Sequence, residues 1–138
     1  MAAGMDVSDR MGSVLGNILI VEDDLDTREM LATLLGTAGF RAVSAEDGLE
    51  GLHLLRTVRH GAPDVPCLIL LDLSMPRLSG GEFRRAQLAD PSVASVPMAV
   101  MSGAVDAEQR AQTLGAVATV TKPVDVERLL DVVRRYCA

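Results

Sequence analysis

The sequence predicts an α/β fold, a doubly wound sheet of five parallel strands with helices on both faces. Short apolar runs alternate five times with helix-like segments from Asn17 onward, and this alternation is typical of a sheet built from β-α units. The third run, Cys67–Leu71, is apolar throughout, as expected for a central strand covered on both faces. A chain of 138 residues, 49% of them hydrophobic, is sufficient for one domain with a real core.

The first half of the chain contains two of these β-α units. We expect a strand over Asn17–Val21 and then a helix over Leu25–Ala38, with Gly39 as the left-handed residue that ends it. A second strand at Arg41–Ala45 leads to a helix over Gly48–Arg59. The residues that recur at helical spacing are Leu31, Leu34, Leu35 and Ala38 in the first helix and Leu49, Leu52, Leu55 and Arg56 in the second.

The second half of the chain begins at a breaker rich in glycine and proline, Gly61–Pro66. A loop over Ser74–Gly81 separates the third strand from the helix that follows it. The elements expected after the breaker are the strand Cys67–Leu71, the helix Glu82–Leu88, the strand Met98–Met101, the helix Ala107–Leu114, the strand Val117–Thr121 and the helix Val126–Tyr136. In the last helix we expect the inward residues to be Leu129, Leu130 and Val133.

The overall composition limits the class of protein. A formal net charge of −6 argues against direct binding to nucleic acid, which needs a basic surface. Residues 1–16 show no periodicity, and we expect them to form a flexible tail before a domain at 17–138. The tail lacks the apolar stretch of a secretory signal, and no apolar run approaches the ~18 residues of a membrane span. We therefore expect a soluble, cytoplasmic protein with no membrane partner.

The rarer residue types give few functional signals. Two cysteines, Cys67 and Cys137, make no disulfide framework, and Cys67 is expected to be a small buried hydrophobic residue. The histidines His53 and His60 are seven positions apart, which is not a metal-binding spacing, and we expect both on the surface. The three aromatic residues are too few to build a core, so the core is expected to be aliphatic.

Three of the predicted strands end at charged residues. The first runs into Glu22 and Asp23, the third into Asp72, and the fifth into Lys122. Because the carboxyl ends of parallel strands share one edge of a sheet, these side chains would meet in one crevice. Carboxylates this close repel one another unless a cation joins them. The pattern therefore favours a hard metal ion beside a nucleophilic aspartate.

Each charged residue also has a simpler structural interpretation. For Asp24 or Asp26 we prefer a role in capping the first helix, because acidic side chains favour the positive end of the helix dipole. Asp72 could be a turn residue, Lys122 a solvated loop lysine, and Ser102 a plain turn former. A carboxylate directly after five apolar residues, however, is costly to bury without a partner, which favours a functional role for Asp72.

Taken in order, the motifs at the strand ends resemble those of the receiver domain of bacterial response regulators. They are the acidic pair Glu22-Asp23, Asp72 within Leu-Leu-Asp-Leu-Ser-Met-Pro, Ser102 within Met-Ser-Gly, and Lys122-Pro123. The turn Ala45–Gly48 is a further likeness, and the resemblance covers about 120 residues. Each motif alone is weak, but four in order make a specific signal. The resemblance implies a flavodoxin-like sheet with strand order 2-1-3-4-5.

The resemblance implies a phosphorylatable signalling domain and not a conventional turnover enzyme. Asp72 would accept a phosphoryl group from a histidine kinase or a histidine phosphotransfer protein. Mg²⁺ would be bound by Asp23, Asp72 and the backbone carbonyl of Ser74, with Glu22 acting through water. Lys122 would offer its positive charge to the phosphoryl oxygens.

The resemblance also implies how the signal would leave the site. Ser102 would donate a hydrogen bond to the phosphoryl group, helped by backbone N–H groups near Gly103 and Ala104. A cis peptide is expected at Lys122-Pro123. A downstream protein would read the face made by the fourth helix, the fifth strand and the fifth helix. One departure from the family is Thr119, which stands where an aromatic switch residue is common.

Other phosphate chemistries fit this sequence less well. There is no Gly-x-x-x-x-Gly-Lys-Ser/Thr loop for a nucleotide, and Ser74 stands where a dehalogenase-type phosphatase would have a second aspartate. The acidic turn after the first strand argues against a flavin phosphate site. Two alternatives stay open: a pseudo-receiver that binds partners without phosphorylation, and a receiver taken from a hybrid kinase or a longer regulator.

Overall fold

The computed structural model describes residues 16–57, 65–75 and 78–137. The predicted tail apart from Gly16, most of the predicted breaker, and His60 lie outside these residues. His53 lies on the surface, as predicted. Within the described ranges, no helix has the length and apolar character needed to cross a membrane.

A single sheet of parallel strands forms the centre of the described chain. Its strands are β1 (Asn17–Val21), β2 (Arg41–Ala45), β3 (Leu68–Asp72), β4 (Met98–Ser102) and β5 (Ala118–Thr121). They pair in the order β2-β1-β3-β4-β5, and every pair is parallel. The predicted fold class and strand order are confirmed. β3 therefore lies at the middle of the sheet, between β1 and β4.

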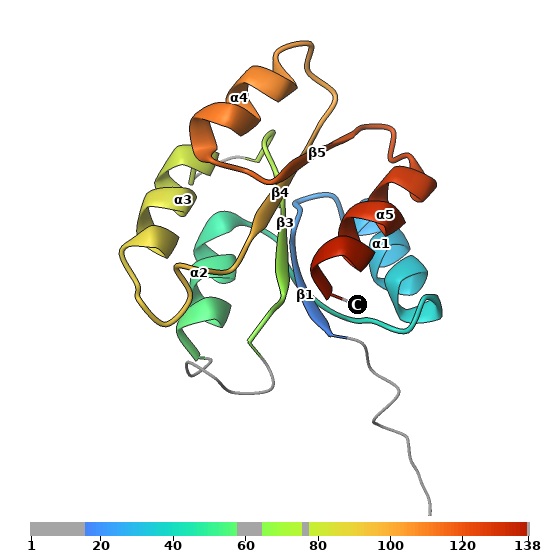
Figure 1. Cartoon of the computed structure of the whole chain (residues 1–138), viewed down its shortest axis with the longest axis horizontal. Coiled ribbons are helices and arrows are strands. Elements are labelled where there is room, and N and C mark those ends of the chain that lie inside the picture. The colour runs from blue at the N-terminus through green and yellow to red at the C-terminus, as the bar shows by residue number, and fades with distance from the viewer. Residues whose placement is uncertain (1–15, 58–64, 76–77, 138) are drawn as a thin grey trace, which may run out of the picture.

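Helices cover both faces of the sheet. They are α1 (Leu25–Thr37), α2 (Gly48–Thr57), α3 (Gly80–Leu88), α4 (Ala107–Leu114) and α5 (Val126–Cys137). Figure 1 shows α1 and α5 on one side of the sheet and α2, α3 and α4 on the other. α3 begins before its predicted start at Glu82, because Ser79 and Glu82 form a reciprocal capping box that supports a first turn containing two glycines.

Alternate residues of the central strands enter two separate cores. On β1, Ile18 and Ile20 pack toward α1 and α5, whereas Leu19 and Val21 pack toward the other three helices. Both cores are mainly aliphatic, as predicted, although the fully buried Phe83 is the largest side chain in the second one. Strands buried on both faces explain why the central runs of the sequence are apolar without alternation.

The inward faces of α1 and α5 largely follow the predicted spacing, whereas α2 differs. Leu49 has the predicted helical spacing but is 54% exposed. α2 instead approaches the sheet through Gly51, where a Cβ atom would lie 3.0 Å from Val21 and 3.1 Å from Phe83. This close approach turns Leu52 and Leu55 inward and leaves Leu49 in solvent.

The two cysteines correct a prediction. Cys67 is not an isolated hydrophobic residue, because it forms a disulfide with Cys137, at a Cα–Cα distance of 5.4 Å. Cys67 lies directly before β3, and Cys137 is the last residue of α5. Their sequence separation of 70 residues hides this contact in the sequence. It arises because α5 packs back across the sheet and ends beside the starts of the central strands.

Candidate functional site

The backbone of the candidate site is held by the sheet beyond the ends of the strands. The N–H of Glu22 donates to the carbonyl of Ala45 at 3.0 Å, and the N–H of Lys122 donates to that of Ser102 at 3.0 Å. Directly after the central strand, the N–H of Leu73 donates to the carbonyl of Met101 at 3.1 Å. The ladder therefore fixes the chain directions at the three points where the charged side chains leave it.

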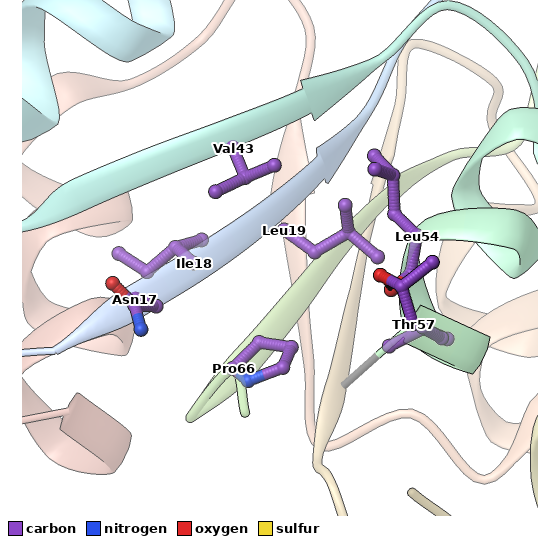
Figure 2. Close-up of a pocket in the computed structure, with 8 residues that line it drawn as sticks. Asn17, Ile18, Leu19, Val43, Leu54, Thr57 and Pro66 are labelled. Atoms are coloured by element: carbon purple, nitrogen blue, oxygen red, sulfur yellow. Dashed lines mark hydrogen bonds between the residues drawn. The ribbon is translucent and has the colours of Figure 1, made fainter. Parts of the chain in front are cut away.

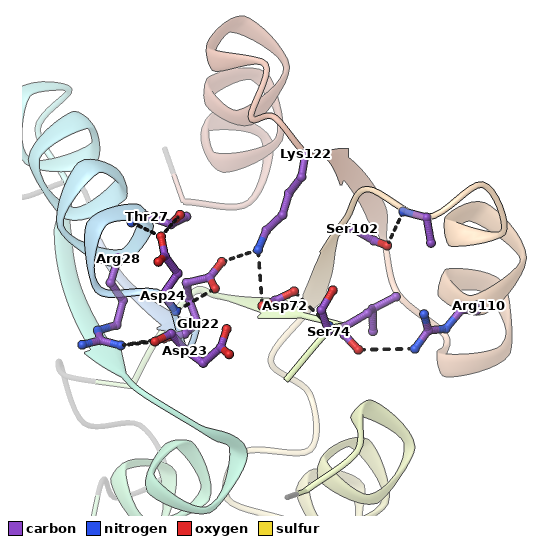
Figure 3. A network of polar contacts seen from close by, with 12 residues as sticks. Glu22, Asp23, Asp24, Thr27, Arg28, Asp72, Ser74, Ser102, Arg110 and Lys122 are labelled. Carbon is purple, nitrogen blue, oxygen red and sulfur yellow. Dashed lines mark hydrogen bonds and ion pairs between the residues drawn. The ribbon is translucent and has the colours of Figure 1, made fainter. Parts of the chain in front are cut away.

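Three carboxylates meet at this edge of the sheet, as the sequence predicted. Glu22 and Asp72 are buried, with 0% and 1% exposure, whereas Asp23 is exposed. One oxygen from each of the three lies within 4.8 Å of the others. Figure 3 shows them converging from the ends of β1 and β3. Oxygen ligands at this spacing suit a hard divalent cation.

Lys122 reaches into the same cluster from the end of β5. Its Nζ lies 2.6 Å from Glu22 Oε1 and 3.3 Å from Asp72 Oδ2. The peptide bond between Lys122 and Pro123 is cis, as the family resemblance implied. The ammonium group therefore lies between two buried carboxylates and neutralises part of their charge (Figure 3).

The two oxygens of Asp72 have different surroundings. Oδ1 accepts a hydrogen bond from the backbone N–H of Ser74 at 2.9 Å. Oδ2 is buried and has no hydrogen-bond partner among the described residues, although it faces the Lys122 ammonium at 3.3 Å. A buried carboxylate oxygen without a hydrogen bond is unusual, so Oδ2 is an available ligand or nucleophile.

Burial dominates the proton affinity of Glu22. It raises the pKa of that carboxyl to about 7, against the opposing effects of the hydrogen bonds from Lys122 and the Asp24 backbone. For Lys122, burial lowers the pKa, but the hydrogen bond to Glu22 and the charge of Asp72 outweigh it and the net direction is upward. Lys122 is thus a permanent positive charge at neutral pH.

Asp24 does not join the acidic cluster. Its side chain caps α1 by accepting from the backbone N–H of Thr27 at 2.9 Å. Hydrogen bonds from the Thr27 hydroxyl and backbone hold the pKa of Asp24 below its ordinary value. The prediction that Asp24 caps the first helix and lies outside the acidic pair is thus confirmed.

Ser102 lies on the other side of Asp72 from Glu22, at the end of β4 (Figure 3). It is 2% exposed, and its Oγ accepts from the backbone N–H of Ala104 at 3.0 Å. The next residues, Gly103 and Ala104, are exposed. A Cβ at Gly103 would lie 3.2 Å from the carbonyl of Lys122, so a small residue lets the loop pass close to the lysine. Thr119 is buried, at 9% exposure.

Two arginines contact the site and were not singled out from the sequence. Arg28 Nη1 donates to the carbonyls of Glu22 at 2.9 Å and Asp23 at 3.3 Å, and so supports the acidic turn. Arg110 Nη2, from α4, donates to the carbonyl of Leu73 at 3.4 Å. No local pattern marks these residues, because their partners are backbone atoms on other elements.

Comparisons with known proteins agree with this geometry. The sequence profile of the response regulator receiver domain matches residues 18–134. Sporulation initiation phosphotransferase F of Bacillus subtilis is 30% identical over 120 residues, which cover 86% of this chain and 91% of that protein. The structure of the chemotaxis response regulator CheY4 of Vibrio cholerae matches with a TM-score of 0.75 at 27% identity, over 87% of this chain and 97% of its own.

A third similar structure is the receiver domain of a sensor histidine kinase from Pseudomonas aeruginosa, which contains a magnesium ion in its active-site cleft. Its TM-score is 0.77 at 22% identity, over 88% of this chain and 97% of that one, a likeness of fold. The family profile covers most of the sequence, and the strand-end motifs meet in space as the resemblance implied. The chain belongs to the response regulator receiver domain family.

Proposed function

We propose that this domain is a phosphoacceptor in a two-component or phosphorelay system and is phosphorylated on Asp72. The observation that carries the proposal is the environment of Asp72 Oδ2, which is buried, receives no hydrogen bond from the described residues and lies 3.3 Å from Lys122 Nζ. The Ser74 N–H holds the other oxygen and thereby orients the carboxylate. The phosphoryl donor is the phosphohistidine of a histidine kinase or phosphotransfer protein.

The acidic cluster fits a Mg²⁺ ion. In this proposal Asp23, Asp72 and the backbone carbonyl of Ser74 would hold the ion, and Glu22 would act through water. Both Glu22 oxygens already accept hydrogen bonds, Oε1 from Lys122 and Oε2 from the Asp24 N–H at 3.1 Å, which supports an indirect role. The ion would neutralise the charge of the carboxylates and of the phosphoryl oxygens. The receiver domain from P. aeruginosa holds a magnesium ion in its active-site cleft, which supports Mg²⁺ as the choice of ion.

The residues of the chain position and stabilise the transfer. Asp72 Oδ2 forms a bond to phosphorus as the phosphorus–nitrogen bond of the phosphohistidine breaks. The electron pair stays on the imidazole, which leaves neutral when its other nitrogen carries a proton. Lys122 places a compact positive charge beside the phosphoryl oxygens. Because such transfer depends mainly on positioning and charge neutralisation, the domain assists its own modification and acts as a signalling switch.

Ser102 connects the site to the surface. Its Oγ now accepts from the Ala104 N–H, and when the phosphoryl group is present its hydroxyl donates to a phosphoryl oxygen. This new hydrogen bond draws the loop after β4 toward Asp72 and favours one of two conformations of the domain. This loop leads into α4, and the surface formed by α4, β5 and α5 then presents the change to a downstream protein.

Phosphorylation with a small donor tests the proposal directly. The purified protein is incubated with acetyl phosphate and Mg²⁺, and the phosphoryl group is counted by intact mass. We expect one phosphoryl group on the wild type and none on Asp72→Asn. Asp24→Asn is the matched control, because its carboxylate caps α1 nearby and asparagine can keep that cap. An unmodified wild type, or an Asp72→Asn variant modified as fully as the wild type, contradicts the assignment.

A further inference from the structure

The disulfide between Cys67 and Cys137 lies far from the acidic site. It joins the residue before β3 to the last residue of α5, whereas Asp72 ends β3. Asp72 lies five positions after Cys67, which is about 16 Å at the rise of a β-strand. The end of α5 lies near the start of β1 in Figure 1. Chemistry at the cysteines is thus spatially separate from chemistry at the carboxylates.

The surroundings of the two sulfurs are asymmetric. Cys137 is 7% exposed and belongs to the core formed with α1 and α5, whereas Cys67 packs at the edge of that core and is only partly buried. Cys67 is also held by its backbone, whose N–H donates to the carbonyl of Asn17 at 2.9 Å. A reagent from solvent therefore reaches Cys67 first, and Cys137 is the inner partner.

Gly16 leaves room for the disulfide. A Cβ atom at this position would lie 2.8 Å from Cys67 Sγ and 3.4 Å from the carbonyl of Cys137. A free thiol can rotate away from such a methyl group, but a sulfur bonded to Cys137 cannot do so without moving α5. A side chain at position 16 should therefore destabilise the oxidised protein more than the reduced protein.

We propose that Cys67 and Cys137 are a reversible redox modification site that fixes the last turn of α5 to the start of β3. The oxidant is a low-molecular-weight disulfide. The Cys67 thiolate attacks one of its sulfurs and releases one small thiol, and the Cys137 thiolate then attacks Cys67 Sγ and releases the second. The two cysteines lose two electrons and two protons, and the small disulfide becomes two thiols.

Oxidation restrains α5, the helix that contributes to the expected output face. The cross-link closes a loop with a sequence separation of 70 residues, and a closed loop of that size limits the unfolded chain strongly. In the native state it holds the end of α5 against β3 without contact with Asp72. The redox state of the cell would thus adjust the mobility of α5, while the site of phosphorylation stays intact.

The first measurement defines the oxidation state and its reversibility. The native protein is treated with glutathione disulfide or with dithiothreitol, and its free thiols are alkylated and counted by intact mass. We expect no reactive thiol after glutathione disulfide and two after dithiothreitol, without denaturation. Two reactive thiols after oxidation exclude the disulfide, and a bond that dithiothreitol reduces only in the unfolded protein excludes reversible modification.

The second measurement tests the effect on α5. We expect the melting temperature of the oxidised wild type to exceed that of the reduced form by about 10 °C, and amide hydrogen exchange to slow mainly in residues 129–137. Cys67→Ser and Cys137→Ser are the controls: neither can form the cross-link, so neither should show the rise in melting temperature or the slower exchange of α5 after oxidation. Equal melting temperatures and equal exchange of α5 in the two oxidation states contradict the restraint.

Gly16→Ala tests whether position 16 packs closely against the disulfide itself, or whether a larger side chain there disturbs packing equally in both oxidation states. The added methyl group should lower the melting temperature of the oxidised protein more than that of the reduced protein, and move the oxidation midpoint toward a more oxidising glutathione buffer. Equal losses in both states, with an unchanged midpoint, contradict the close packing of the disulfide. Both cysteine variants should still accept a phosphoryl group from acetyl phosphate.

Discussion

The two carboxylate oxygens of Asp72 have different partners at the site. Its Oδ1 is oriented by the Ser74 N–H, and its Oδ2 is left to face Lys122. A buried charge without a full set of partners costs stability, so this residue is better explained by reactivity than by folding. The same reasoning separates it from Asp24, whose oxygen is committed to the N-terminus of α1.

Lys122 should matter for phosphorylation more than for metal binding. Lys122→Ala removes the charge beside Asp72 Oδ2 but leaves the three carboxylates in place. We expect the variant to bind Mg²⁺ at least as tightly as the wild type, because a competing cation is gone, and to lose phosphorylation by acetyl phosphate or its conformational consequence. Isothermal titration with Mg²⁺ and intact mass after acetyl phosphate measure the two effects. If the variant is phosphorylated and changes conformation like the wild type, Lys122 has no role in phosphorylation and is a simple surface charge.

Glu22 should make the metal-free domain less stable as the pH rises. Its pKa in the folded state is about 7, above the ordinary 4.5, so the native state binds the proton more tightly than the unfolded state. The stabilising contribution of Glu22 to the free energy of unfolding is therefore fully present below pH 4.5. It is lost as the pH rises from 4.5 toward 7.

Glu22→Gln should reduce the fall in the free energy of unfolding between pH 4.5 and pH 7 by on the order of 2 kcal/mol. Urea unfolding of both proteins in the presence of a chelator, at a series of pH values, measures the slope. The slope is the relevant quantity, because the amide also changes the contacts with Lys122 and Asp24 at every pH. Parallel curves for the two proteins would assign the pH dependence to another group.

At the scale of elements, the loop after β4 is the part best placed to carry the signal. Ser102 is buried at the strand end, while residues 103–106 are exposed and lead directly into α4. Thr119, buried on β5, is β-branched and stiff and too small to fill the space of an aromatic side chain. Under the proposed function, the backbone after Ser102 should therefore move when its hydroxyl turns toward the phosphoryl group, because a packed core does not tolerate voids.

Amide spectra with and without beryllofluoride, a phosphoryl mimic, should locate this movement. We expect the largest chemical-shift changes in residues 102–110, with smaller changes in residues 117–121. Ser102→Ala should reduce the changes in the loop while Asp72 still binds the mimic, since only the hydroxyl is lost. Changes confined to residues 117–121 with a silent loop would mean that the signal leaves by another route.

Most elements could be predicted because their signals are local. The apolar runs and the helical segments between them placed β1, β2 and α4 at their observed bounds, and the acids after β1 marked the start of α1. The inward face of α2 could not be predicted from spacing alone, because it depends on how closely Gly51 approaches Val21 and Phe83. Contacts of this kind exist only once two distant segments are packed.

At the scale of the whole molecule, parallel topology explains both what the sequence revealed and what it hid. All strands point the same way, so charged residues at their ends must meet at one edge, and Glu22, Asp72 and Lys122 do so. The opposite edge gave no such signal. Cys137 reaches Cys67 only because α5 runs back across the sheet, and the supporting arginines Arg28 and Arg110 bind backbone carbonyls that leave no trace in the sequence.

The crowding of three carboxylates should also link the stability of the whole domain to divalent cations. One oxygen of each of Glu22, Asp23 and Asp72 lies within 4.8 Å of the others, and Lys122 offsets only part of their charge. A cation that binds only the native state raises its stability by mass action. Under the proposed function, the metal-free domain would therefore lose local stability through the repulsion of these carboxylates.

Millimolar Mg²⁺ should raise the melting temperature of the wild type on the order of 5 °C if its concentration is tens of times the dissociation constant. Asp23→Asn should lose most of this rise and, by removing one repelling charge, melt slightly higher than the wild type without metal. Sodium chloride at equal ionic strength is the control, because screening also weakens the repulsion. A wild type whose melting temperature is the same in both salts would argue for the pseudo-receiver, a domain with this fold that binds partners without phosphorylation.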